Sequence, residues 1–279
     1  LVVLMTSDKT LDTSKEFEKL GCDDYVTKPF LPMILKEIIN NSTDEALAGY
    51  GKKIKIEVDE SSNSIIVRDF GRGVPFGIRE DGENVLVSIY TKSHTGGKFS
   101  NDSYKNASGL NGIGGSCVCL SSKQFQVKSY RNGIMASASF VKGELSFYTE
   151  VPTTDPNGTE VLFIPDPEVF CNGEIGFSYE RICEDIKAIS YLYSGITFVV
   201  TGKLIDGTED RVEFCAKNGI TDFIKDNAYK PLHKHIITAS ASNEEDSVEI
   251  AFQWGAGKER SYVFVNGLLC PEGGTPITG

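Results

Sequence analysis

The strongest pattern in this sequence is a long amphipathic helix followed at once by two short strands. Over residues 32–50, apolar residues recur at the three- and four-residue spacing that places them on one helix face. Two glycines just beyond the last of them predict the end of the helix. Residues 53–58 and 65–69 alternate between apolar and polar, and the polar link at 59–64 predicts a hairpin. The predicted buried stripe of the helix consists of Ile34, Leu35, Ile38, Ile39, Ala46 and Leu47.

The remaining chain predicts both strands and helices. Asn-Gly pairs at 132–133 and 157–158 indicate turns in a β-rich stretch from 124 to 165. The other predicted elements are strands at 1–6 and 25–27, helices at 12–20, 179–193 and 220–227, strands from 196, and strands at 248–254 and 261–265.

The acidic composition limits what the surface can bind. The net charge is −11, which argues against a DNA-binding surface because phosphate contacts require clustered Lys and Arg. The apolar content of 40% is enough for a core, and no apolar run is long enough to span a bilayer. The seven cysteines lack zinc-type spacing, which predicts a cytoplasmic protein with no metal held by Cys or His.

The first motif with chemical meaning lies on the predicted long helix. Glu37, Asn41, Asp44 and Glu45 are spaced to share one face, opposite the apolar stripe. A carboxylate one turn from an amide can hold a water and a magnesium ion side by side, because magnesium takes oxygen ligands and keeps several waters. Taken alone, the motif is better explained by a solvated helix face.

The second motif is Asp-Phe-Gly-Arg-Gly-Val-Pro at 69–75, directly after a predicted strand. Asp69 can accept a hydrogen bond from an exocyclic amine such as that of adenine. The glycines let the backbone approach a flat ring closely and turn sharply. The alternative interpretation is an ordinary Gly-Pro turn.

The third motif occupies 91–115, a stretch rich in Gly, Ser and Asn and poor in large aliphatic residues. Such a stretch indicates a functional lid or a disordered segment. Glycines leading into a helix start expose backbone N–H groups to phosphate, and Lys98 adds a positive charge. The segment does not follow the P-loop pattern.

Together, the three motifs resemble those of the GHKL ATPases, the group that includes gyrase, the heat-shock chaperone and histidine kinases. The segments EIINNSTDEALAGYG, DFGRGVP, HTGGKFSNDSYK and SGLNGIGGS are similar to the B subunits of type II DNA topoisomerases, gyrase or topoisomerase IV. NGTEVLFIPD, FQW and FVNGLLCPEGGTP continue the resemblance, which covers roughly residues 33–279.

The resemblance implies a role for each residue that matches a motif. Glu37 would be the general base that activates the attacking water, and Asn41 would bind Mg²⁺. Asp69 would accept the adenine amine, with Thr159 beside it through water. The residues that would hold the phosphates are Lys98 and the backbone of Leu110, Asn111, Gly112, Ile113, Gly114 and Gly115.

Further residues would border the nucleotide. Glu45 and Arg72 would form an ion pair at the edge of the pocket, and Arg131 would lie at its mouth. Gly73 and Pro75 would complete the adenine motif. Three positions depart from the family: Phe70 replaces a usually polar residue, and Asn111 and Pro276 stand where the family has His.

The resemblance also implies a fold and a division into domains. The fold would be α+β, a two-layer α/β sandwich whose mixed, mostly antiparallel sheet carries helices on one face. Residues 32–214 would form the GHKL ATP-binding domain, and 215–279 the start of a transducer domain related to ribosomal protein S5. Residues 1–31 instead resemble part of a response-regulator receiver domain through LVVLMTSD and LGCDDYVTKPF. The family's N-terminal arm and its transducer lysine are expected to lie outside this sequence.

The implied function is an ATP- and Mg²⁺-dependent module of a type II topoisomerase. ATP binding would close a dimer gate and hydrolysis would reopen it, driving DNA strand passage together with the topoisomerase A protein. Most of the DNA would be held by other parts of the enzyme, and no membrane would be involved. Two alternatives remain: a hybrid histidine kinase, and a nucleotide-binding but catalytically inactive fragment.

Overall fold

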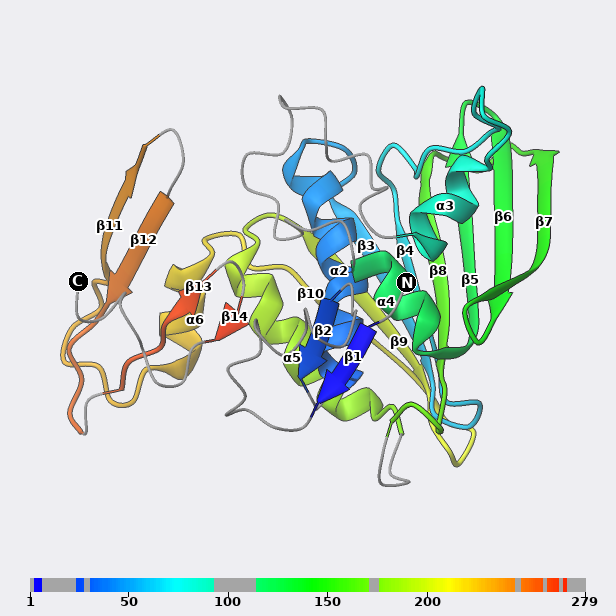
Figure 1. Ribbon diagram of the computed structural model, residues 1–279. Coiled ribbons are helices and arrows are strands. Elements are labelled where there is room, and N and C mark those ends of the chain that lie inside the picture. The colour runs from blue at the N-terminus through cyan, green and yellow to red at the C-terminus, as the bar shows by residue number, and fades with distance from the viewer. Residues whose placement is uncertain are drawn as a thin grey trace.

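The computed structural model describes residues 3–6, 24–27, 31–92, 114–170, 176–243, 247–257, 260–265 and 268–269. Its centre is an eight-stranded sheet in the order β10-β9-β3-β4-β8-β5-β6-β7 (Figure 1). In this sheet β3 pairs with β9 in parallel, and every other neighbouring pair is antiparallel. The strands are β3 (Lys53–Asp59), β4 (Ser64–Asp69), β5 (Ser122–Arg131), β6 (Ile134–Val141), β7 (Glu144–Pro152), β8 (Gly158–Pro165), β9 (Thr197–Lys203) and β10 (Glu209–Phe214).

Four helices belong to this body: α2 (Leu31–Leu47), α3 (Val85–Thr91), α4 (Gly114–Leu120) and α5 (Tyr179–Leu192). Figure 1 shows α2, α4 and α5 on the same side of the sheet. Alternate residues of β3 are buried, as a strand with one covered face requires. The predicted α+β class, with a mixed and mostly antiparallel sheet, is confirmed.

Two tight turns explain the run of hairpins after β5. Asn132 and Gly133 join β5 to β6 with φ of 52° and 77°, and Lys142 and Gly143 join β6 to β7 with φ of 50° and 81°. Positive φ at both central residues is the geometry that matches the twist of paired strands. The Asn-Gly turn is the one that the sequence predicts, whereas Lys142 carries no comparable signal.

The long helix follows its predicted stripe with one exception. Ile34, Leu35, Ile38, Ile39 and Ala46 are all buried, whereas Leu47 is 54% exposed. Leu47 is the last residue of α2, where the chain reverses at Gly49 with φ +91°. The helix therefore ends before a neighbouring element covers this side chain.

The predicted polar face of α2 contains both exposed and buried residues. Asn41 is exposed, but Asp44 is 5% exposed and its neighbours Ser42 and Thr43 are buried as well. The protein therefore covers a wider arc of the helix than the apolar stripe alone. The prediction that Asp44 lies opposite the buried side was wrong for this reason.

The first described residues form a small parallel sheet. β1 (Val3–Thr6) and β2 (Asp24–Thr27) form a parallel pair, at the positions of two predicted strands. The helix predicted at 12–20 lies outside the described residues.

Beyond the sheet, α6 (Ile220–Asn227) coincides with a predicted helix and is followed by two antiparallel pairs. These are β11 (Ile237–Ser242) with β12 (Ser247–Phe252), and β13 (Phe264–Val265) with β14 (Leu268–Leu269). Phe223 of α6 stacks edge-on against Tyr191 of α5, at 5.4 Å between ring centroids. No helix in the described part of the chain is long and apolar enough to cross a membrane.

Candidate functional site

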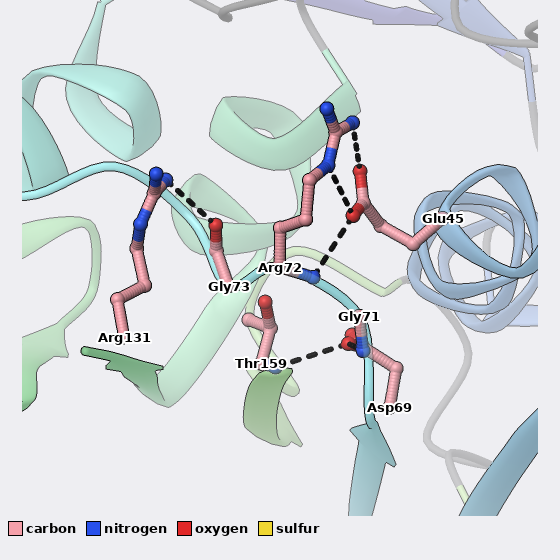
Figure 2. Close-up of polar contacts among 7 residues, drawn as sticks. All are labelled: Glu45, Asp69, Gly71, Arg72, Gly73, Arg131 and Thr159. Atoms are coloured by element: carbon pink, nitrogen blue, oxygen red, sulfur yellow. Dashed lines mark hydrogen bonds and ion pairs between the residues drawn. The ribbon is translucent and has the colours of Figure 1, made fainter. Parts of the chain in front are cut away.

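Asp69, the last residue of β4, is a buried carboxylate whose partners come from three segments. The residue is 5% exposed. Its Oδ1 accepts the backbone N–H of Gly71 at 2.9 Å and that of Thr159 at 3.1 Å (Figure 2). Its Oδ2 lies 3.4 Å from the Ser42 hydroxyl of α2, which is a long contact. One oxygen is thus satisfied by backbone, while the other keeps acceptor capacity for a ligand.

The surroundings of Asp69 make its charge costly. Burial raises the pKa of Asp69 to about 6. The backbone N–H groups of Gly71 and Thr159 lower this pKa, and so does the Arg68 guanidinium. The Glu45 carboxylate raises it further. At neutral pH the site therefore holds a desolvated negative charge that an amine donor would stabilise.

Two glycines allow this close packing. A Cβ at Gly158, whose φ is +141°, would lie 2.2 Å from the Asp69 carbonyl oxygen. A Cβ at Gly71 would lie 2.7 Å from the Cβ of Glu45. The strand β8 and the helix α2 can therefore approach the end of β4 only because side chains are absent at these positions.

Gly158→Ala should destabilise the fold by more than about 3 kcal/mol, because it combines an unfavourable φ with a backbone clash. Gly207→Ala is the matched control: Gly207 also has positive φ, at +85°, but nothing lies within 4 Å of its added Cβ. That change should cost only the left-handed conformation, about 1 kcal/mol. Urea unfolding of both variants measures the difference, and equal losses would contradict the close approach at Gly158.

Glu45 and Arg72 form the ion pair expected from the sequence. Arg72 Nε donates to Glu45 Oε2 at 3.0 Å, and Nη2 donates to Oε1 at 2.9 Å. The Arg72 backbone N–H also donates to Oε2, at 3.1 Å. This bidentate pair joins α2 to the loop after β4 (Figure 2). Its predicted place beside a nucleotide remains a prediction.

The loop that continues to Pro75 is fastened to β5. Arg131 Nη1 donates to the Gly73 carbonyl at 3.1 Å, and Ser129 Oγ donates to the Val74 carbonyl at 2.6 Å. A Cβ at Gly73 would lie 2.7 Å from a backbone oxygen of β5, and Pro75 is exposed. The structure thus brings Gly73 and Arg131 together, and the loop is held by several contacts rather than being a free Gly-Pro turn.

Glu37 lies where α2 meets the start of α4. A Cβ built at Gly114 would lie 1.8 Å from Glu37 Oε1, so the carboxylate rests directly against that glycine. Gly115 is close to the Tyr90 ring, at 3.2 Å for an added Cβ. Asn41 follows one turn after Glu37 and is exposed.

The donor set fits magnesium better than a metal that needs a full protein cage. Within the described residues, no group of three His, Cys, Asp or Glu is placed to hold a metal ion. Asn41 is an exposed residue of α2, and its amide oxygen is the kind of ligand that Mg²⁺ takes. Because Mg²⁺ is usually held by one or two protein oxygens together with phosphates and water, a single such residue is sufficient.

Part of the predicted phosphate-binding segment lies outside the described residues. This applies to Lys98, Leu110, Asn111, Gly112 and Ile113. Their roles remain sequence-based predictions.

Three residues of the site do not stand out in the sequence. Ser42 faces Asp69 from α2, inside a motif whose other members carry the more obvious chemistry. Tyr90 of α3 is buried against Phe125, with ring centroids 5.1 Å apart, and burial strongly raises its pKa, with a further contribution from Asp69. Arg68 precedes Asp69 and is also buried. Its only signal in the sequence is a charged residue inside a strand pattern.

Known proteins resemble this chain over most of its length. Residues 27–168 match the family model described as histidine kinase-, DNA gyrase B-, and HSP90-like ATPase, and residues 219–279 match the model described as DNA gyrase B. The B subunit of DNA gyrase from Myxococcus xanthus is 32% identical over 255 residues, which is 89% of this chain and 31% of that protein. The B subunit of DNA topoisomerase 4 from Enterococcus faecalis is 34% identical over 251 residues, 88% of this chain and 36% of that protein.

A solved structure shows the same fold. The 43K ATPase domain of Thermus thermophilus gyrase B, in complex with an aminocoumarin, aligns with a TM-score of 0.70 and 28% identity. The alignment covers 85% of this chain and 61% of that one. The chain spans about a third of the length of the sequence relatives above.

Sheet, helices and buried carboxylate together define a GHKL-type ATPase domain. The chain belongs to the histidine kinase-, DNA gyrase B- and HSP90-like ATPase family. Within that family, the relatives and the second matched segment favour the gyrase B branch over the histidine kinases.

Proposed function

We propose that this chain is the ATP-binding and ATP-hydrolysing module of a type II DNA topoisomerase of the gyrase B kind. The observation that carries the proposal is Asp69, whose Oδ1 is saturated by two backbone N–H groups while its Oδ2 keeps acceptor capacity. A buried carboxylate in this state suits the exocyclic amine of adenine. The match of residues 27–168, which contain the site, to the ATPase family model and the match of residues 219–279 to the gyrase B model support the same assignment.

The residues around Asp69 would divide the work. Glu37 of α2, whose carboxylate lies against Gly114 at the start of α4, would take a proton from the attacking water. Asn41 would supply an oxygen to Mg²⁺, which when bound neutralises phosphate charge. Lys98 and the backbone of 110–115 would hold the phosphates. Catalysis would come mainly from positioning and charge neutralisation, as is general for phosphoryl transfer.

The proposal extends to the assembled enzyme. ATP binding would bring two copies of the chain together, and hydrolysis would release them, in the cytoplasm and with the topoisomerase A protein as partner. The net charge of −11 makes this segment a poor DNA surface. DNA would therefore be held chiefly by other parts of the enzyme. Measuring ATP-dependent relaxation or supercoiling of DNA by the assembled enzyme tests the proposed topoisomerase function.

Nucleotide affinity should depend on pH through Asp69. Because burial raises the pKa of Asp69 to about 6, the carboxylate is ionised above that pH and protonated below it. A protonated acid no longer offers its charge to the adenine amine, so affinity for a non-hydrolysable ATP analogue should be constant above pH 7 and fall as pH drops through 6. Calorimetric titration from pH 5 to 8.5 measures this.

A GTP analogue is the control, since it lacks the exocyclic 6-amine. It should bind more weakly at pH 7.5. Equal affinity for the two analogues at pH 7.5, or no binding of either, would contradict the proposed adenine site.

A further inference from the structure

Arg68 lies directly behind the proposed adenine carboxylate. Ile65, Val67 and Asp69 of β4 are buried on the face that the helices cover. Side chains alternate along a strand, so Arg68 projects from the opposite face of the sheet. It is nevertheless only 9% exposed. A buried guanidinium requires partners for its donors.

Two carbonyl groups supply those partners. Arg68 Nη1 donates to the Asp69 carbonyl, and Nη2 donates to the Pro156 carbonyl, each at 2.8 Å. The first carbonyl belongs to the end of β4, and the second to the turn that leads into β8. The planar fork of Arg68 therefore joins two chain segments that are far apart in sequence.

Aromatic rings cover the guanidinium. Its Cζ lies 4.0 Å from the ring centroid of Tyr130 on β5 and 5.1 Å from that of Phe70. The rings contribute cation–π attraction and keep water from the two hydrogen bonds. The geometry suits Arg and not Lys, because an ammonium group lacks the planar fork.

The Arg68 hydrogen bonds lie next to the Thr159 N–H group that orients the Asp69 carboxylate. The ladder between β4 and β8 ends at the pair Arg68–Glu160. Beyond it, the Arg68 side chain holds the segment that contains Gly158 and Thr159 against the end of β4. The Thr159 N–H donates to Asp69 Oδ1, so the clamp fixes one of the groups that orient the carboxylate.

Several charged and titratable groups face Asp69. Glu45 approaches from α2 and Tyr90 from α3, and both are acids. The Gly71 and Thr159 N–H groups approach from the loop and from β8. Arg68 is the cation whose charge lowers the pKa of Asp69, against burial and Glu45.

We propose that Arg68 is a positioning residue for adenine recognition: from the far face of the sheet it clamps the start of β8 to the end of β4 and places a positive charge behind the Asp69 carboxylate. The inference rests on the proposed function, because it takes Asp69 as the acceptor of the adenine amine. It assigns a role to a residue outside the pocket itself.

Two substitutions separate the effect of the two Arg68 hydrogen bonds, which form the clamp, from the effect of its positive charge. Arg68→Gln removes both, so affinity for a non-hydrolysable ATP analogue at pH 7.5 should fall about tenfold or more, and the pH midpoint of binding should move upward. Arg68→Lys keeps the charge but cannot span both carbonyls. It should weaken binding while leaving the midpoint close to that of the parent.

Lys128→Gln is the matched control, because Lys128 is a cation on the same outer face, 2.8 Å from Glu160. This change should leave the affinity within about twofold of the parent value and the pH midpoint of binding unchanged. Calorimetry over pH 5–8.5 measures all four proteins, and urea unfolding establishes that each is folded. If Arg68→Gln does not fold, Arg68→Lys is the deciding variant. An Arg68→Lys protein that binds the ATP analogue with the parent affinity would overturn the proposed role of the two Arg68 hydrogen bonds.

The outcomes distinguish this inference from the function on which it rests. A parent chain that binds no ATP analogue overturns both. A parent that binds with a pH step near 6, together with an Arg68→Gln variant of equal affinity and midpoint, overturns the role of Arg68 alone.

Discussion

Glu37→Ala is expected to remove ATP hydrolysis while leaving affinity for a non-hydrolysable ATP analogue within a few-fold. The Glu37 carboxylate lies against Gly114 at the start of α4, whereas the proposed adenine acceptor Asp69 is held by the N–H groups of Gly71 and Thr159. Truncation at Glu37 therefore leaves the base-binding contacts intact. General-base catalysis contributes about 10²–10⁴-fold, so turnover should fall by that amount.

Phosphate release and equilibrium binding should be measured on one preparation. Glu57→Ala serves as the control, since Glu57 is an exposed carboxylate on β3, outside the site. Turnover at the parent rate in Glu37→Ala would show that another group is the base. Loss of binding and turnover together would make Glu37 a ligand contact or a structural residue. A parent that binds ATP without releasing phosphate would favour the inactive-module alternative.

Asp69→Asn should reduce ATP affinity by roughly 10- to 150-fold, the loss expected for a hydrogen bond to a buried charge. The Asn oxygen can still accept the Gly71 and Thr159 N–H groups that now reach Oδ1. Its amide nitrogen then takes the place of Oδ2 and presents a donor to the adenine amine. Recognition fails although the backbone is preserved.

The same substitution should not lower stability at neutral pH. Because the folded-state pKa of Asp69 is raised, folding stability falls as pH rises from the ordinary Asp value of 3.8 towards 6 and stays lowered above it. Asn removes this penalty, so the unfolding temperature at pH 7 should equal or exceed that of the parent. Asp206→Asn, in the exposed turn after β9, is the control with the same chemical change. Unchanged ATP affinity in Asp69→Asn would refute the pocket.

Periodicity predicts the elements that form locally. The long helix α2, the β3–β4 hairpin and helices α5 and α6 follow from short-range spacing, and the Asn132–Gly133 turn follows from its backbone requirements. The motif residues Glu45, Arg72 and Asp69 are identifiable because their chemistry appears in a short run of sequence. Element order along the chain is thus accessible.

Contacts between distant segments are not accessible in this way. Nothing near Arg68 in the sequence indicates that Pro156 and Tyr130 surround it, since those contacts depend on strand register. Spacing places Asp44 on a solvated face because it reveals one covered side of a helix and not how wide the cover is. Leu47 shows the converse, an apolar side chain that its neighbours do not reach.

The parallel pairing of β3 with β9 has a consequence for how this domain folds. Lys53 faces Thr197 in that register, so the pairing of β3 with β9 brings together residues that are far apart along the chain. Loop-closure entropy must be overcome before these contacts form, which makes this a slow folding topology. The site itself needs Thr159 beside Asp69, which lies 90 residues earlier, so the proposed nucleotide pocket also depends on contacts between distant segments. ATP would consequently act late: by binding the native state it would slow unfolding and leave the early folding rate unchanged.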